Sequence, residues 1–237
     1  MGVTVLQPYS VPEGQTGPQT IEFLAKRLLA LGAVQASTFI VDCETFIPNP
    51  QHGTPKTVHV LHNSEYPAST FAVLDTGTKQ VPLVADALFD LLMLKMAPAH
   101  TSKKQTKIES KGARFEYGDF LIKLGSVTMA ENFKGILLEV EYRPCVIPSN
   151  CWELIRELLQ GFLGVSIPAT IPPYFNTPSI MSMNHPKSSE IFNPNHTKQN
   201  DVYQPMDTIN QYLEHFGNFR KQTMLSGGTG IGAPLRS

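Results

Sequence analysis

Residues 135–164 read GILLEVEYRPCVIPSNCWELIRELLQGFLG, and this stretch carries the two hydrophobic periods from which we predict the fold. Its first half alternates, as is typical of a strand with one apolar side, here Ile136, Leu138, Val140 and Tyr142. Its second half has apolar residues at helical spacing: Trp152, Ile155, Leu159 and Phe162. Asn150 with Glu153 reads as a capping box, and Gly164 ends the helical run. We therefore predict a strand over 136–147, followed by a helix over 151–163 that packs on a sheet.

Upstream of this stretch the same two periods recur. Thr16 with Gln19 reads as another capping box, apolar residues at helical spacing follow, and Gly32 ends them, so we predict a helix over 18–31. Short alternating segments rich in Val, Ile, Phe and Thr then predict four strands, over 37–47, 56–62, 69–75 and 80–85. A hairpin turn is expected at residues 75–78.

A second helix and three more strands are predicted between these segments and residue 135. Asp86 can cap a helix that runs to about Met96 and is apolar nearly all round, as expected of a buried helix. The next strands are predicted over 105–110, 113–118 and 119–129. Turns are expected at 111–112 and 134–135, where a lysine precedes a glycine.

This order of elements predicts an α+β fold with a mainly antiparallel, barrel-like sheet of about eight or more strands and flanking helices. An open sheet with helices on one face is the alternative. Residues 1–222 are expected to form a single barrel-type domain, with a flexible proline-rich loop at 165–205 and a closing helix at 207–222. Residues 223–237 are expected to be a flexible glycine-rich tail.

The composition excludes several classes of function. Of the 237 residues only 16% are charged, against roughly 25% in typical soluble domains, which indicates a surface covered by something other than water. The net charge of -1 provides no positive field for nonspecific nucleic-acid binding. The three cysteines include no CxxC pair, so neither a disulfide framework nor a cysteine zinc site is predicted. The absence of a signal-like start and of a long apolar run favours a soluble protein of a reducing, intracellular compartment.

Two acidic doublets at strand spacing are the strongest candidates for chemistry: Asp42 with Glu44, and Glu139 with Glu141. If both faced the interior of a barrel, they could hold a hard divalent cation, as in the Glu-x-Glu sites of triphosphate tunnel enzymes. Such enzymes also need several interior cations, for which Lys123 and Arg143 are the only obvious strand candidates and Arg114 an uncertain one. We therefore expect these carboxylates on a solvated or interface-facing side of the sheet, with a metal-dependent triphosphatase as the alternative.

The remaining motifs predict no catalytic, cofactor-binding or metal site. His59 and His62 lie three apart on a predicted strand and therefore face opposite sides. No serine lies in a GxSxG elbow, and the cysteines fall where small buried apolar residues are usual. The helix over 151–163 has Arg156 as its only basic residue, which argues against a DNA-recognition helix.

At the level of longer runs, the sequence is similar to one known family, and the matching runs are FIVDCETF (39–46), HNSEYP (62–67), ALFDLLMLKM (87–96), KIESKGARFEYGDFLIKLGSVTM (107–129) and the 135–164 stretch. They resemble subunit twenty of the Mediator of RNA polymerase II transcription, a component of the head module. The run DTINQYLEHFGNFRKQ (207–222) is similar to the closing helix of that family.

The resemblance implies a β-barrel-type fold with flanking helices, pairing with the related Mediator subunit eighteen, and a nearby helix of subunit eight. It further implies contacts with other head-module subunits and, indirectly, with RNA polymerase II in the nucleus. No catalytic activity, cofactor, membrane contact or direct sequence-specific DNA binding is expected. The acidic doublets would then be architectural relics of a distant relation to the triphosphate tunnel fold.

Overall fold

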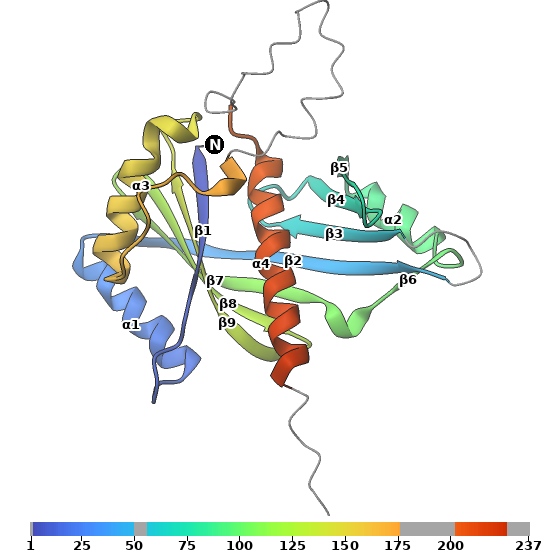
Figure 1. The fold of residues 1–237 in the computed structure, drawn as a ribbon, viewed down its shortest axis with the longest axis horizontal. Helices are drawn as coiled ribbons and strands as arrows, with labels where there is room; N and C mark the ends of the chain where they lie inside the picture. The colour runs from blue at the N-terminus through green and yellow to red at the C-terminus, as the bar shows by residue number, and fades with distance from the viewer. Residues whose placement is uncertain (1, 50–55, 176–201, 227–237) are drawn as a thin grey trace, which may run out of the picture.

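The computed structural model describes residues 2–49, 56–175 and 202–226. In these ranges nine strands form one sheet, and four α-helices and two short 3-10 helices accompany it (Figure 1). The elements are, in order, β1 (Val3–Tyr9), α1 (Gly17–Ala30), β2 (Val34–Pro48), β3 (Thr57–Asn63), β4 (Ser69–Asp75), β5 (Gln80–Asp86), α2 (Leu88–Lys95), β6 (His100–Ser102), η2 (Lys104–Thr106), β7 (Ile108–Tyr117), β8 (Phe120–Met129), β9 (Asn132–Tyr142), α3 (Pro148–Leu163), η3 (Pro173–Phe175) and α4 (Pro205–Ser226). None of the helices in the described part of the chain is long and apolar enough to cross a membrane.

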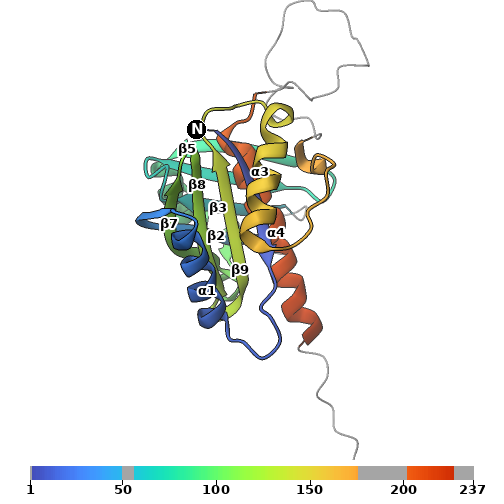
Figure 2. The same cartoon turned by 90° about the vertical axis from the view of Figure 1, so that its left-hand side faces the viewer.

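The strands lie in the order β1-β9-β8-β7-β2-β3-β4-β5, and β6 pairs with the end of β2. Each pairing is antiparallel. The predicted α+β fold with a mainly antiparallel sheet and flanking helices is confirmed. The sheet is barrel-like only in its strong twist, because its path ends at β1 on one side and at β5 on the other (Figures 1 and 2).

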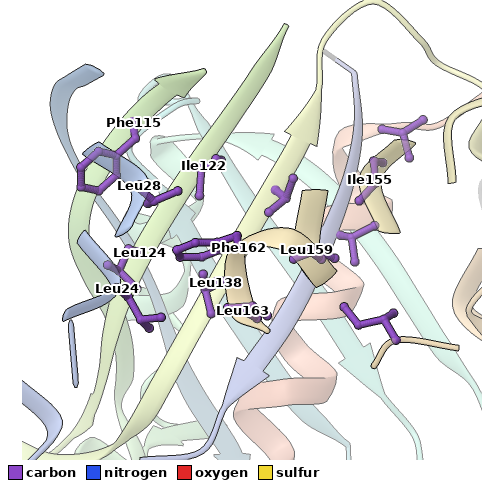
Figure 3. Close-up of a cluster of buried hydrophobic side chains, with 14 of the residues drawn as sticks. Leu24, Leu28, Phe115, Ile122, Leu124, Leu138, Ile155, Leu159, Phe162 and Leu163 are labelled. Carbon is purple, nitrogen blue, oxygen red and sulfur yellow. The ribbon is translucent and has the colours of Figure 1, made fainter. Parts of the chain in front are cut away.

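Helices cover both faces of this sheet, not one. Because side chains alternate along a strand, Leu138 of β9 packs with α1 and α3 whereas its neighbour Leu137 packs under α4. The first cluster joins α1 and α3 to β9, β8 and β7, and Figure 3 shows its leucine, isoleucine and phenylalanine side chains converging. The second cluster lies between α4 and the other face, around Tyr212 and Phe216. α4 crosses the middle of the sheet (Figure 1).

The apolar stripe predicted for the helix after β9 is confirmed, since Trp152, Ile155, Leu159 and Phe162 are all buried. The helix ends at Gly164, which has a left-handed backbone with φ of 70°. The predicted capping box is wrong. Pro148 suits the first turn of a helix, where its missing N–H has no partner to lose, so α3 begins at residue 148 and takes Asn150 into its interior.

Two predicted turns are strand interiors. Gly112 lies within the single strand β7, opposite Gly125 of β8, where a Cβ on residue 112 would come within 1.9 Å of the Leu124 carbonyl oxygen. The glycine therefore permits a close approach of two strands, and the separate strands predicted over 105–110 and 113–118 are one. Gly135 lies within β9, where a Cβ would stand 2.5 Å from the ring of Phe219 in α4. The β8–β9 turn instead falls at residues 130–131, both of which have positive φ.

Other predictions hold at the level of single contacts. The Thr16–Gln19 capping box is present at the start of α1. In the turn at 75–78, Gly77 has a φ of 80° and its N–H donates to the Asp75 carboxylate at 2.7 Å. The structure adds β1 and β6, for which we predicted no strand. Of the range 165–205, only 165–175 and 202–205 lie within the described residues, and they include the buried side chains of Ile167, Phe175 and Tyr203.

Candidate interaction surface

The structure keeps the two acidic doublets apart. β7 and β8 lie between β2 and β9, which at the usual strand spacing separates these two strands by about 15 Å across the sheet. They also point to opposite faces. Asp42 and Glu44 alternate with Cys43, which packs under α4, whereas Glu139 itself lies under α4. The described residues contain no group of three or more His, Cys, Asp or Glu side chains placed to hold a metal ion.

Glu139 is buried, and the prediction that it lies on a solvated or interface-facing side is wrong. Its side chain is 4% exposed, and Oε1 accepts a hydrogen bond from Lys123 Nζ at 2.9 Å. The phenol of Tyr212 in α4 donates to the other carboxylate oxygen. Burial, followed by the charge of Glu139, raises the pKa of Tyr212 well above 10. The carboxylate thus anchors α4 to the sheet and is not open to a ligand.

A second polar group fastens α2 to the opposite face. His62 of β3 contacts Asp42 of β2 through Nδ1 at 2.9 Å and Asp90 of α2 through Nε2 at 3.1 Å. Lys107 Nζ lies 2.9 Å from the other oxygen of Asp42. The hydrogen bond that His62 donates to the Asp42 carboxylate raises the pKa of His62 above 6.5, while burial acts against the increase. Protonated His62 can donate to both carboxylates at once, so its charged form holds α2 most firmly.

From the contacts of His62 with Asp42 and Asp90 we predict a pH-dependent contribution to the stability of the fold. Because the pKa of His62 is raised by folding, its contribution is fully present below about pH 6.5 and is lost as pH rises through the folded-state value. We expect wild type to lose its advantage over His62→Gln on going from about pH 6 to about pH 9, by less than about 1 kcal/mol because the His62 side chain is 41% exposed.

Urea unfolding of both chains across this pH range measures the difference. His59→Gln is the matched control, because burial lowers the pKa of His59, so its contribution to stability changes with pH in the opposite direction, increasing as pH rises toward about 6.5. A stability difference between wild type and His62→Gln that stays constant with pH would contradict the assignment.

His59 and His62 face opposite sides of β3, as their spacing predicts. His59 Nδ1 lies 3.1 Å from the Thr45 hydroxyl, and the ring lines a groove of about 510 Å³ between α4 and the sheet face of β3–β5. Asp75, Glu214 and Arg220 also line this groove. The guanidinium of Arg220 donates to the Thr106 carbonyl oxygen at 3.1 Å, so this cation serves the fold.

The helix predicted to be buried is instead the most exposed apolar element of the described chain. α2 begins at residue 88, and Met93 is its only buried residue. The exposed fractions of its leucines are 65% for Leu88, 53% for Leu91, 48% for Leu92 and 70% for Leu94. The prediction fails because α2 lies at the β5 end of the sheet, away from α1, α3 and α4 (Figure 1). Among the described residues, no other helix packs over the exposed leucines of α2 there.

Edge strand β5 extends this apolar area. Pro82 lines the groove under α4, so Val81 and Leu83 point to the other face, the face of α2. They are 37% and 46% exposed. We call Val81, Leu83, Leu88, Leu91, Leu92 and Leu94 together the α2–β5 surface. Among the strands that the structure describes, β5 pairs only with β4.

A comparison with models of known protein families identifies the family of this chain. The model described as "TATA-binding related factor (TRF) of subunit 20 of Mediator complex" matches residues 1–217. The chain belongs to the Mediator subunit 20 family. The resemblance read from the sequence runs is thereby confirmed, and the match extends through most of α4.

Relatives in the Mediator subunit 20 family match over nearly their whole length. "Mediator of RNA polymerase II transcription subunit 20" of Anopheles gambiae is 65% identical over 224 residues, covering 94% of this chain and 97% of the relative. The protein of that name from Drosophila melanogaster is 61% identical over 241 residues, covering 98% and 91%. The one from Homo sapiens is 41% identical over 227 residues, covering 94% and 96%.

Membership of the Mediator subunit 20 family and the separated doublets leave the triphosphatase alternative without support. The features that sequence reasoning missed had weak signals. Lys123 is the one charged residue in the apolar run FLIKLGSV of β8. A lone lysine in such a run indicates a buried ion pair with an acidic residue. The sequence does predict that α2 is apolar nearly all round, but it does not show that these leucines lie outside the two buried clusters of the described residues.

Proposed function

We propose that this chain is a non-enzymatic scaffold of the Mediator coactivator complex and that the α2–β5 surface is where another subunit binds. Membership of the Mediator subunit 20 family supports the first part. The exposed leucines of α2 support the second. In this role the chain helps to relay regulatory signals to RNA polymerase II at promoters in the nucleus, through its place in the head module.

The size of the α2–β5 surface carries the interface proposal. From their exposed fractions, the six side chains present on the order of 500 Å² of mainly apolar area. This is comparable to the largest patches on ordinary monomers, which are often functional, and to a large part of the roughly 800 Å² that each partner buries in a standard interface. An edge strand beside it can also offer backbone groups to a partner strand.

The partner that we propose for this surface is Mediator subunit eighteen, a related barrel. The helix of subunit eight and other head-module subunits complete the expected neighbourhood. A partner that covers α2 permanently would also account for the low charged fraction of the chain, because obligate interfaces are more apolar than the rest of a protein surface.

The test is affinity purification of the tagged full-length chain from nuclear extract, with mass spectrometry of what stays bound after a high-salt wash. We expect Mediator head subunits to be recovered, led by subunit eighteen. Recovery of the chain alone would overturn the scaffold proposal.

The interface itself is tested by Leu88→Gln combined with Leu91→Gln. Both side chains are more than half exposed, so the change should leave the stability of the isolated chain within about 0.5 kcal/mol. We expect recovery of the partner to fall at least tenfold, because the glutamines remove two of the most exposed apolar side chains from the proposed contact.

Leu29→Gln is the control, since Leu29 is 49% exposed and belongs to α1, a helix that lies on the other side of the molecule from α2 (Figure 1). If the control and the double variant lose the partner equally, or neither loses it, the α2–β5 surface is not the binding site.

A further inference from the structure

Two cysteine thiols meet at one carbonyl group in the connection between β9 and α3. Cys145 Sγ donates to the Ile147 carbonyl oxygen at 3.2 Å, and Cys151 Sγ donates to the same oxygen at 3.5 Å. Both are free thiols. Cys151 lies in the first turns of α3 and is 1% exposed, whereas Cys145 is only partly buried. One thiol of the pair is therefore within reach of solvent and the other is covered.

The two thiols also interact with each other. Burial raises the pKa of Cys151 to about 12, and Cys145 adds to this increase through its charge and through a hydrogen bond between the two side chains. The Ile147 carbonyl has a further partner, the N–H of Asn150 at 3.1 Å. It therefore stays hydrogen-bonded even if both thiols turn away from it, and no buried acceptor is left unpaired.

We propose that Cys145 and Cys151 form a dithiol site that closes to an intrachain disulfide on reaction with a small disulfide such as oxidised glutathione. The Cys145 thiolate attacks one sulfur of oxidised glutathione and releases the other half as a thiolate. Cys151 then loses its proton and attacks the Cys145 sulfur, which forms the Cys145–Cys151 bond and expels the second glutathione thiolate. The pair loses two electrons and two protons, and oxidised glutathione becomes two molecules of glutathione.

The bond would form where distant parts of the chain are joined. The carbonyl oxygen of Cys145 accepts the N–H of Val3 in β1 at 2.9 Å. The carbonyl oxygen of Val146 accepts the N–H of Tyr203, just before α4, at 2.7 Å. A ring closed between residues 145 and 151 therefore acts on the junction that holds the start of β1 and the segment leading into α4. Oxidation should therefore affect the contacts of β1 and of the segment before α4 as well as the two cysteines.

The test equilibrates the full-length chain in buffers of increasing ratio of oxidised to reduced glutathione. The chain is then unfolded in urea with excess iodoacetamide, so that buried thiols are also trapped, and digested with trypsin. Both cysteines fall in the peptide 135–156, because trypsin does not cleave between Arg143 and Pro144, and Cys43 falls in another peptide. The disulfide is read as a peptide that lacks two hydrogens and carries no alkyl group. The same titration is run on the chain unfolded in urea.

We expect the folded chain to reach half oxidation at a ratio at least tenfold lower than the unfolded chain, because the fold holds the two sulfurs together. Cys145→Ser should give only peptide that is alkylated at Cys151. The proposal is overturned if the folded chain needs as much oxidant as the unfolded chain, or if it carries only a mixed disulfide with glutathione at Cys145.

Discussion

Replacing Lys123 by alanine lowers the free energy of unfolding by about 3–5 kcal/mol, because it leaves the Glu139 carboxylate buried without its cation. The Lys123 side chain is 3% exposed and its ammonium lies 2.9 Å from Glu139. Its other carboxylate neighbour, Glu65, is 3.9 Å away. After the change, the Tyr212 phenol is the one donor to Glu139 that remains among the described residues. Urea unfolding followed by circular dichroism measures the loss.

Two further variants separate the buried charge from other effects. Lys123→Met combined with Glu139→Leu removes both charges while keeping most of the volume, so it should be much less destabilising than Lys123→Ala alone. Lys111→Ala breaks an ion pair of the same 2.9 Å length with Glu109, but Lys111 is 58% exposed and its charge stays solvated, so this change should destabilise the chain far less than Lys123→Ala. Equal effects of Lys123→Ala and Lys111→Ala would show that Glu139 is not desolvated as described.

Truncating Phe162 to alanine should cost about 3–5 kcal/mol, because the ring is 1% exposed in the cluster that joins α1 and α3 to the sheet (Figure 3). Trp152→Ala, at the other end of the same stripe, should lower the free energy of unfolding by a similar amount. Its indole N–H also donates to the Ala169 carbonyl oxygen at 3.0 Å, which would lose this partner.

Leu154→Ala is the control for both truncations, since Leu154 is on the same helix but 46% exposed. Its cost should be about 1 kcal/mol or less. If Phe162→Ala and Trp152→Ala both cost less than about 1 kcal/mol in urea unfolding, the stripe does not face the chain's own core. It would then face solvent or a partner.

Elements whose apolar residues bind neighbours in the same chain could be predicted from the sequence. The stripe from Trp152 to Phe162 and the box formed by Thr16 and Gln19 are local patterns, and each has one structural solution. Glycine signals are less specific. Gly164 and Gly77 do adopt positive φ, but Gly112 and Gly135 are needed for close contacts with β8 and α4. The residues next to a glycine in the sequence do not show which distant strand or helix will pack against it.

The polar contacts and the exposed surface were predicted only in part, because they too depend on residues far apart in the sequence. Alternation along β9 separates Glu139 from Leu138, but Tyr212, which covers Glu139, lies 73 residues further along the chain. Likewise, a mostly apolar helix such as α2 is consistent with a core or with an interface, because both remove leucines from water. Only the position of α2 at the β5 end of the sheet distinguishes the two.

The pairing of β1 with β9 has a consequence for how the protein is made. Val3 pairs with Tyr142, and the N–H of Leu6 donates to the side chain of Gln211, 205 residues later. A ribosome releases the N-terminal strand long before either partner exists. While the chain is being translated, this strand must wait with its apolar side chains uncovered, so we expect nascent chains to engage a chaperone until residue 211 has left the exit tunnel.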